Sequence, residues 1–144
     1  MIAFIAMLIV ISIVDIKKRE IPNGFIMIIG IIGVMAMVFQ DHLTFANRLL
    51  GFFCISLPLL IIAMIKPNAF GGGDIKLMAV CGFYLGVIPA ILSFFIAVMV
   101  GGIYGVWLLI KKNGREKEFA FGPFLCGGIG IVLFFETQIM KWLF

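Results

Sequence analysis

The stretch LMAVCGFYLGVIPAILSFFIAVMVGGIYGVWLLI, residues 77–110, decides the fold predicted for this chain. It has no charged side chain and is too long for one comfortable membrane crossing, which takes about 20 residues. Gly82, Gly86 and Pro89 lie where a turn between two crossings would fall. The stretch therefore predicts two consecutive membrane-spanning helices.

The composition of the whole chain excludes an ordinary soluble globular protein. Of its 144 residues, 64% are hydrophobic and 12% are charged, and the mean hydropathy is +1.27. Soluble domains carry about 25% charged residues, so too little polar surface remains to cover a globule of this size. We expect one membrane-embedded domain over residues 1–144, with the lipid bilayer as its surroundings.

Charge placement predicts the number of crossings. Nine of the eleven Lys and Arg residues share one side if residues 77–110 cross twice: Lys17, Lys18, Arg19, Lys66, Lys76, Lys111, Lys112, Arg115 and Lys117. Arg48 and Lys141 are left opposite. The positive-inside rule then predicts an all-α protein with six transmembrane helices and both termini extracytoplasmic. The expected spans lie near 1–15, 23–40, 48–65, 74–86, 87–110 and 119–137. The first span lacks the basic region and the cleavage site of a secretory signal, so it is expected to stay in the protein.

The net charge of +4 fits the same rule, so it does not indicate a nucleic-acid partner. Cys54, Cys81 and Cys126 lie in apolar stretches and are expected to be small buried hydrophobes. His42 is expected in an extracytoplasmic loop, away from any site. The basic run at 111–118 is expected to be a solvated loop, with acidic lipid or substrate as an alternative partner.

Two aspartates are expected at the cytoplasmic margin of the bilayer. Asp15 ends the first span in "SIVDIKKREIPN", and Asp74 begins the fourth in "AFGGGDIKLMA". Each has a structural alternative: Asp15 as the polar end of a span paired with the adjacent basic cluster, and Asp74 as a helix N-cap. Carboxylates near hydrocarbon are costly and usually functional, so a pair at one depth indicates a site.

A pair of carboxylates can hydrolyse a peptide bond without a metal, a cofactor or a nucleophilic side chain. Two carboxyl groups close together share one proton over a wide pH range. The ionised group acts as a general base on water, while the protonated group polarises the scissile carbonyl. Gly71, Gly72 and Gly73 leave room for an extended substrate backbone, although a flexible turn between spans would explain them too.

The motifs resemble those of the type IV prepilin peptidases. "FGGGDIKLMA" resembles the family's G-x-G-D motif, carried here by Gly71, Gly73 and Asp74 and followed by Lys76 and Leu77. The family's other aspartate precedes a basic stretch and an I-P-N, as Asp15 precedes "KKRE" and then Ile21, Pro22 and Asn23. A third family-like stretch is "FGPFL" at 121–125, so the resemblance covers essentially the whole chain.

The resemblance implies an intramembrane-type aspartic endopeptidase at the inner (cytoplasmic) membrane, with its active site facing the cytoplasm. The implied partner is a prepilin or pseudopilin with a basic leader and a hydrophobic helix. Asp15 and Asp74 would be the catalytic pair. The residues that would shape the site are Gly71, Gly72, Gly73, Lys76, Pro22 and Asn23. Lys76 has the alternative role of a snorkelling contact to lipid phosphate.

One departure from the family bears on activity. Many members carry an insertion with two C-x-x-C pairs, linked to N-methylation of the new pilin N-terminus, and this sequence has no such pair. It therefore resembles the short peptidases without methyltransferase activity that serve Flp-type pili. Archaeal preflagellin peptidases share the motif and remain an alternative.

A non-enzymatic alternative comes from a different class. A multi-pass carrier or scaffold could use Asp15 and Asp74 as a proton relay. Such a relay predicts carboxylates near the middle of the membrane, whereas these two are expected at its surface. It also gives no reason for "GGGD" and "REIPN" in one chain.

Overall fold

The described part of the protein is built from six helices. The structure, a computed structural model, describes residues 2–18, 20–67, 71–111 and 121–143. The helices in these ranges are α1 (Ile2–Lys18), α2 (Asn23–Phe39), α3 (Phe45–Ile65), α4 (Gly72–Leu85), α5 (Val87–Lys111) and α6 (Gly122–Leu143), and the same ranges contain no strand. The all-α prediction is confirmed, and each helix coincides with one predicted span to within a few residues at most ends.

The long apolar stretch is divided at Gly86, between α4 and α5. Gly86 has φ 87° and ψ −179°, a backbone conformation that is essentially restricted to glycine. Its N–H group still donates to the carbonyl oxygen of Gly82 at 2.8 Å, which closes the last turn of α4. Pro89 lies in the first turn of α5, where a helix needs no N–H donor. The chain can therefore reverse without a long loop.

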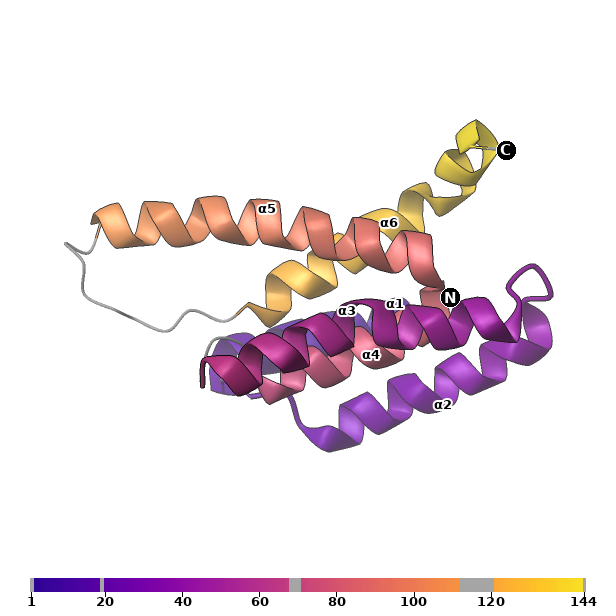
Figure 1. The fold of residues 1–144 in the computed structure, drawn as a ribbon, viewed down its shortest axis with the longest axis horizontal. Helices are drawn as coiled ribbons and strands as arrows, with labels where there is room; N and C mark the ends of the chain where they lie inside the picture. The colour runs from indigo at the N-terminus through magenta and orange to yellow at the C-terminus, as the bar shows by residue number, and fades with distance from the viewer. Residues whose placement is uncertain (1, 19, 68–70, 112–120, 144) are drawn as a thin grey trace.

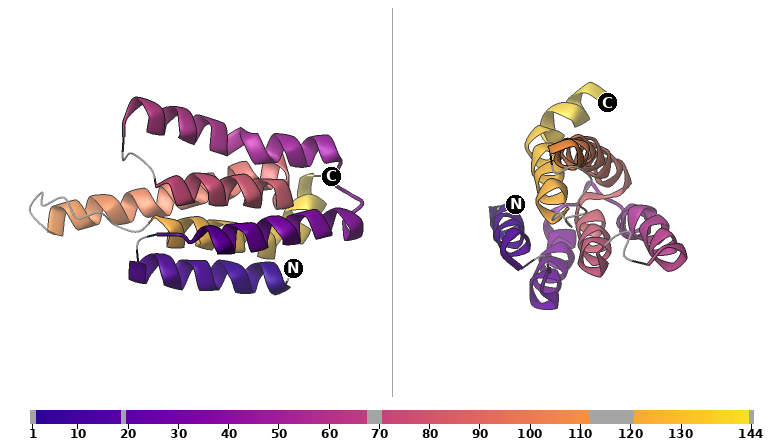
Figure 2. Two further views of the ribbon diagram at one scale, coloured as in Figure 1. Left: turned by 90° about the horizontal axis from the view of Figure 1, so that it is seen from below. Right: turned by 90° about the vertical axis from the view of Figure 1, so that its left-hand side faces the viewer.

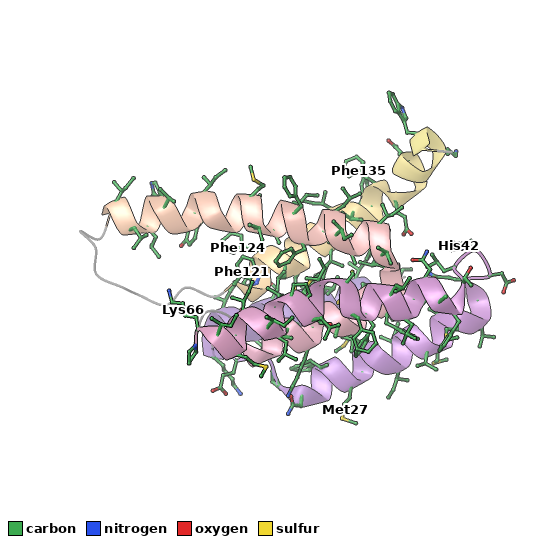
Figure 3. The ribbon with its side chains drawn as sticks, viewed as in Figure 1. Met27, His42, Lys66, Phe121, Phe124 and Phe135 are labelled. Atoms are coloured by element: carbon green, nitrogen blue, oxygen red, sulfur yellow. The ribbon has the colours of Figure 1, made fainter. Side chains whose placement is uncertain are left out.

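Successive helices run antiparallel and form one bundle (Figure 1). α4 packs against α2, α3 and α5, while α6 packs against α1 and α5 (Figure 2). Both ends of the chain lie toward the end of the bundle that carries His42, and Lys66 lies at the opposite end (Figure 3). The basic ends of α1, α3 and α5 therefore share the Lys66 end. Arg19, Lys112, Arg115 and Lys117, which also entered the charge argument, lie outside the described residues.

The α3–α4 contact is made backbone to backbone. A Cβ atom on Gly51 would meet the carbonyl oxygen of Gly82 and lie 2.8 Å from the carbonyl carbon of Gly86. A Cβ atom on Gly82 would in turn lie 2.7 Å from the carbonyl carbon of Gly51. Small residues at a crossing allow helix backbones to approach closely, which is how membrane helices commonly associate. This contact fixes the position of α4 within the bundle.

The α5–α6 contact uses one glycine from each of two glycine pairs. A Cβ atom on Gly101 would lie 2.8 Å from the ring of Phe121, and one on Gly128 would lie 3.3 Å from the backbone nitrogen of Ala97. Gly102 and Gly127 have nothing within 4 Å of the same position. Both pairs could be expected to promote close packing, but only the first of one pair and the second of the other face a neighbouring helix.

The outer surface of the bundle is apolar. α5 exposes large side chains along its length, including Phe95 at 61%, Ile103 at 68% and Ile110 at 75%. α3 and α5 are each long and apolar enough to cross a membrane, while α2 and residues 122–136 are apolar but shorter. An apolar surface of this extent is compatible with lipid rather than with water. The crossing of all six helices stays a prediction.

Arg48, one of the two basic residues that the charge argument left opposite the other nine, lies inside the bundle. It lies in the first turn of α3 and is only 1% exposed. Its guanidinium donates to the carbonyl oxygens of Phe83 and Tyr84, both at 3.3 Å, and to the side-chain oxygen of Gln40 at 3.1 Å. Carbonyls at the C-termini of α4 and α2 lack helical partners, and a cation there is favourable. Arg48 is thus a buried capping group.

Candidate active site

Asp15 lies in the last turn of α1 and is 5% exposed. The backbone of Gly122, the first residue of α6, packs directly against its carboxyl group. The Oδ2 atom of Asp15 is buried and has no hydrogen-bond partner among the described residues. A buried carboxyl oxygen without a partner is costly, and such groups are concentrated at functional sites.

Asp74 lies in the first turn of α4 and is 9% exposed. The N-cap residue of α4 is Gly71, three positions before Asp74. The alternative in which Asp74 itself is the N-cap is therefore wrong. A Cβ atom on Gly71 would lie 3.3 Å from the Oδ2 atom of Asp74, which shows that the carboxyl turns back toward the start of its own helix. A carboxylate in this position is favoured by the free N–H groups of the first turn.

The fold brings the two carboxyl groups together from helices far apart in sequence. Asp15 and Asp74 lie within electrostatic range of each other. Cys126 of α6, which is 6% exposed, lies within electrostatic range of both. Cys81 and Cys126 are buried, as expected, whereas Cys54 is only partly buried. Sequence reasoning offered no ground for placing Cys126 near the aspartates, because it lies in an apolar stretch like the other two cysteines.

The segment before α2 crosses the start of α4, so the two predicted motifs meet. A Cβ atom on Gly73 would lie only 3.0 Å from the Cβ atom of Ile21. Lys76 donates a hydrogen bond from Nζ to the Oδ1 atom of Asn23 at 3.2 Å. Pro22 is the N-cap residue of α2 and is exposed. The start of α2 therefore lies against the start of α4, with Asn23 bonded to Lys76.

The three glycines before Asp74 have different surroundings. Gly71 lies against the carboxyl of Asp74, Gly73 lies against Ile21, and Gly72 has nothing within 4 Å of its potential Cβ position. The sequence argument treated all three as room for a substrate. The structure leaves such room at Gly72, while the space beside Gly73 is filled by this chain's own Ile21.

The start of α6 is a part of the site that the motif argument did not assign. The stretch "FGPFL" was identified only as similar to the family, with no role given to any of its residues. In the structure α6 begins at Gly122, directly beside Asp15. Sequence alone could not show this neighbour, because more than one hundred positions separate the two residues.

The arrangement provides two acid–base groups at one end of the bundle. Buried neighbouring carboxyls favour a state in which one is protonated and the other is ionised. Such a pair can take a proton from water and give one to a substrate oxygen. In the described ranges no three His, Cys, Asp or Glu side chains are grouped as metal ligands. His42 lies at the opposite end of the bundle from this site (Figure 3).

Comparisons with known proteins agree with the motifs. Residues 2–106 match the model of the "Type IV leader peptidase family". A "Prepilin leader peptidase/N-methyltransferase" from Bacillus subtilis (strain 168) is 30% identical over 142 residues, which is 98% of this chain and 57% of the relative. Proteins of the same name from Legionella pneumophila and Aeromonas salmonicida (strain A449) are 36% identical over 74 residues and 33% identical over 78 residues.

These relatives are longer than the present chain. The match covers 50% of this chain and 25% of the Legionella protein, and 52% of this chain and 26% of the Aeromonas protein. No solved structure gives a significant match.

Proposed function

The chain belongs to the type IV leader peptidase family, and on this premise we propose that it is an aspartic endopeptidase. Its substrate is a type IV prepilin or a pseudopilin, whose basic leader it removes. The observation that carries the proposal is the pair Asp15 and Asp74, two buried carboxyls from α1 and α4 within electrostatic range of each other. The same end of the bundle holds the start of α2, which supplies exposed polar groups beside the pair.

The reaction needs only a water molecule and this pair. The ionised carboxyl takes a proton from water as the water oxygen attacks the scissile carbonyl carbon. The protonated carboxyl donates its proton to the carbonyl oxygen, which gives a neutral tetrahedral intermediate. When the carbon–nitrogen bond breaks, the carboxyl that now holds the proton gives it to the leaving amine. The other carboxyl takes a proton from one hydroxyl of the intermediate as the carbonyl re-forms. The products are a leader with a new carboxyl end and a pilin with a new amino end, and the pair again holds one proton.

The proposal places the site at the cytoplasmic face of the inner membrane, with six helices crossing the bilayer and both termini outside. The basic residues Lys17, Lys18, Lys66 and Lys111 end α1, α3 and α5 at the same end of the bundle as the aspartates, which supports this orientation by the positive-inside rule. A basic leader would stay in the aqueous phase beside the site. The hydrophobic segment of the prepilin would lie in the bilayer against the apolar surface of the helices.

We further propose that the chain acts as a peptidase without N-methyltransferase activity, on an Flp-like pilin. Only a short segment joins α1 to α2, and the sequence contains no C-x-x-C pair. The relatives named above carry both activities in their names, so this part requires its own measurement. Mass spectrometry of the cleaved pilin after incubation with S-adenosylmethionine tests it: an unmodified N-terminus is expected, and a gain of one methyl group would contradict it.

The main test is cleavage of a co-expressed prepilin by the wild type and by Asp15→Asn and Asp74→Asn. Asparagine keeps the size of the side chain but cannot carry the shared proton. Losing one acid–base group should lower the cleavage rate by about 10²–10⁴-fold. Asp41→Asn is the matched control, because Asp41 is an exposed acid in the loop that also holds His42. It should cleave as the wild type does.

The outcomes separate the proposal from its alternatives. Normal cleavage by either site variant would exclude the aspartate pair as the chemical machinery. A wild-type protein that is inserted in the membrane and leaves prepilins intact but cleaves a preflagellin would move the substrate to that class. Failure on both classes of substrate would favour a non-enzymatic carrier or scaffold.

A further inference from the structure

We propose that the start of α6, Phe121 and Gly122, is the positioning element that sets the Asp15 carboxyl for the reaction. This inference rests on the proposed peptidase function and adds a part of the machinery that neither the motifs nor the comparisons assign. Gly122 is a positioning residue here, because it touches Asp15 and acts through it.

The first observation is the closeness of the contact. A Cβ atom on Gly122 would meet the Oδ2 atom of Asp15 and would lie 2.7 Å from its Cγ atom and 3.2 Å from its Cβ atom. Real Cβ atoms essentially never approach other atoms within 3.0 Å. The Asp15 side chain is short, so a methyl group at position 122 would displace the carboxyl group itself. Glycine is required at 122 for Asp15 and α6 to keep this geometry.

The second observation is the state of Asp15 itself. Asp15 is only 5% exposed, and its buried Oδ2 atom points at the start of α6 with no hydrogen-bond partner among the described residues. The N–H group of Gly122 faces the same carboxyl. The first turn of a helix presents free N–H groups and a partial positive charge, which favour a carboxylate. α6 therefore offers Asp15 electrostatic stabilisation from a second helix.

The start of α6 is held in place from its other side by α5. The ring of Phe121 lies against Gly101, and the rings of Phe124 and Tyr104 lie 5.3 Å apart between their centroids. Both phenylalanines lie between α5 and the rest of the bundle (Figure 3). The start of α6 therefore contacts α5 through Phe121 and Phe124, and Asp15 through Gly122. A shift of this segment would move the carboxyl, because Gly122 and Asp15 are in contact.

A plain packing role for Gly122 is the competing explanation, and kinetics distinguishes the two. Gly122→Ala is compared with Gly127→Ala, a glycine of the same helix with nothing within 4 Å of its Cβ position. A misplacement of about 1 Å at a reacting group can cost about 10²-fold in rate. We expect kcat of Gly122→Ala on the prepilin to fall by about this factor with little change in KM, while Gly127→Ala keeps both.

A second variant reaches the same segment without touching Asp15. A Cβ atom at Gly101 would press on the Phe121 ring at 2.8 Å, whereas Gly102 has open space. Gly101→Ala should lower kcat by a smaller factor than Gly122→Ala, because the edge of a ring can yield. Gly102→Ala, its neighbour in α5, should leave kcat unchanged.

A stability cycle tests the contact without any enzymatic activity. The apparent melting temperature of the purified full chain in detergent is measured for the wild type, Gly122→Ala, Asp15→Ala and the double variant. Gly122→Ala should lower it by several degrees in the wild-type background and by clearly less in the Asp15→Ala background, where the obstructing carboxyl is gone. Residues in contact give such non-additive effects.

Two results would overturn the inference. Equal melting shifts in both backgrounds would show that Gly122 does not act on Asp15, even if the wild type cleaves its substrate. A Gly122→Ala variant that is folded and cleaves with wild-type kcat would do the same. If the wild type cleaves no substrate while the stability cycle shows coupling, the proposed function fails but the placement of Asp15 by α6 is supported.

Discussion

Lys76 of α4 donates a hydrogen bond from Nζ to the Oδ1 atom of Asn23, the first residue of α2, at 3.2 Å. Both side chains are exposed, and Lys76 lies two residues after Asp74. The bond joins the starts of two helices beside the aspartate pair, and Ile21 packs on Gly73 next to it. The two sequence motifs are thus in direct contact, and Lys76 has a partner within the protein. Its alternative role as a contact to lipid phosphate stays a prediction.

The hydrogen bond between Lys76 and Asn23 should make a small contribution to stability that is lost when either residue is replaced. Lys76→Met and Asn23→Ala should each lower the free energy of unfolding by less than about 1 kcal/mol, because the bond is exposed to solvent. The double variant should lose less than the sum of the two single losses, since both remove the same bond. Urea or thermal unfolding of the four proteins measures this. Fully additive losses would show that the bond is not formed in solution.

Gly72 and Gly73, the two residues directly before Asp74, should respond differently in stability when a methyl group is added. Gly73→Ala forces a Cβ atom to 3.0 Å from that of Ile21 and should cost about 1–3 kcal/mol, the usual range for overpacking. Gly72→Ala meets open space and should be neutral or slightly stabilising. Thermal unfolding of both variants is the measurement. Equal effects at the two positions would contradict the placement of Ile21 over α4.

The turn at Gly86 predicts a strong preference for glycine. Its φ of 87° with ψ of −179° lies in a region where a side chain costs about 1–3 kcal/mol. Gly86→Ala should therefore lower the melting temperature by several degrees, and Gly24→Ala in α2, where nothing lies within 4 Å, should not. A Gly86→Ala protein as stable as the wild type would mean that the reversal between α4 and α5 occurs at another residue.

Buried Arg48 predicts a large loss of stability on substitution. Arg48→Met would leave the carbonyl oxygens of Phe83 and Tyr84 without this donor in a buried position, and unmade hydrogen bonds cost about 1–3 kcal/mol each. Arg48→Lys should rescue only part of the loss, because an ammonium cannot reproduce the fork of a guanidinium. Lys141→Met, at an exposed cation of α6, is the control and should change little. The yield of folded protein and its melting temperature measure the difference.

Much of the architecture followed from patterns that act locally. Charge-free stretches predicted the number of helices and most of their ends, because apolar length and glycine turns depend on neighbouring residues alone. The reversal inside residues 77–110 was predicted from Gly82, Gly86 and Pro89 together, and the structure places it at Gly86. The identification of the family came from short motifs for the same reason.

The candidate site was less accessible to that reasoning. The sequence predicted that Asp15 and Asp74 share one end of the bundle, and the structure places them within electrostatic range of each other. Their catalytic roles stay a prediction until the asparagine variants are measured. The neighbours of the pair, Gly122 and Cys126 of α6, had no signal in the sequence that linked them to either aspartate.

The sequence by itself determined the all-α class of the protein, the six helices of its described residues and the family to which it belongs. The tertiary structure decided which face of each helix turns inward, and so which of two adjacent glycines meets a neighbour, why Arg48 is buried, and which helix end touches Asp15. The physical reason lies in the composition. When nearly every face of a helix is apolar, hydrophobic periodicity cannot select the buried face, and close backbone contacts such as Gly51 on Gly82 select it instead.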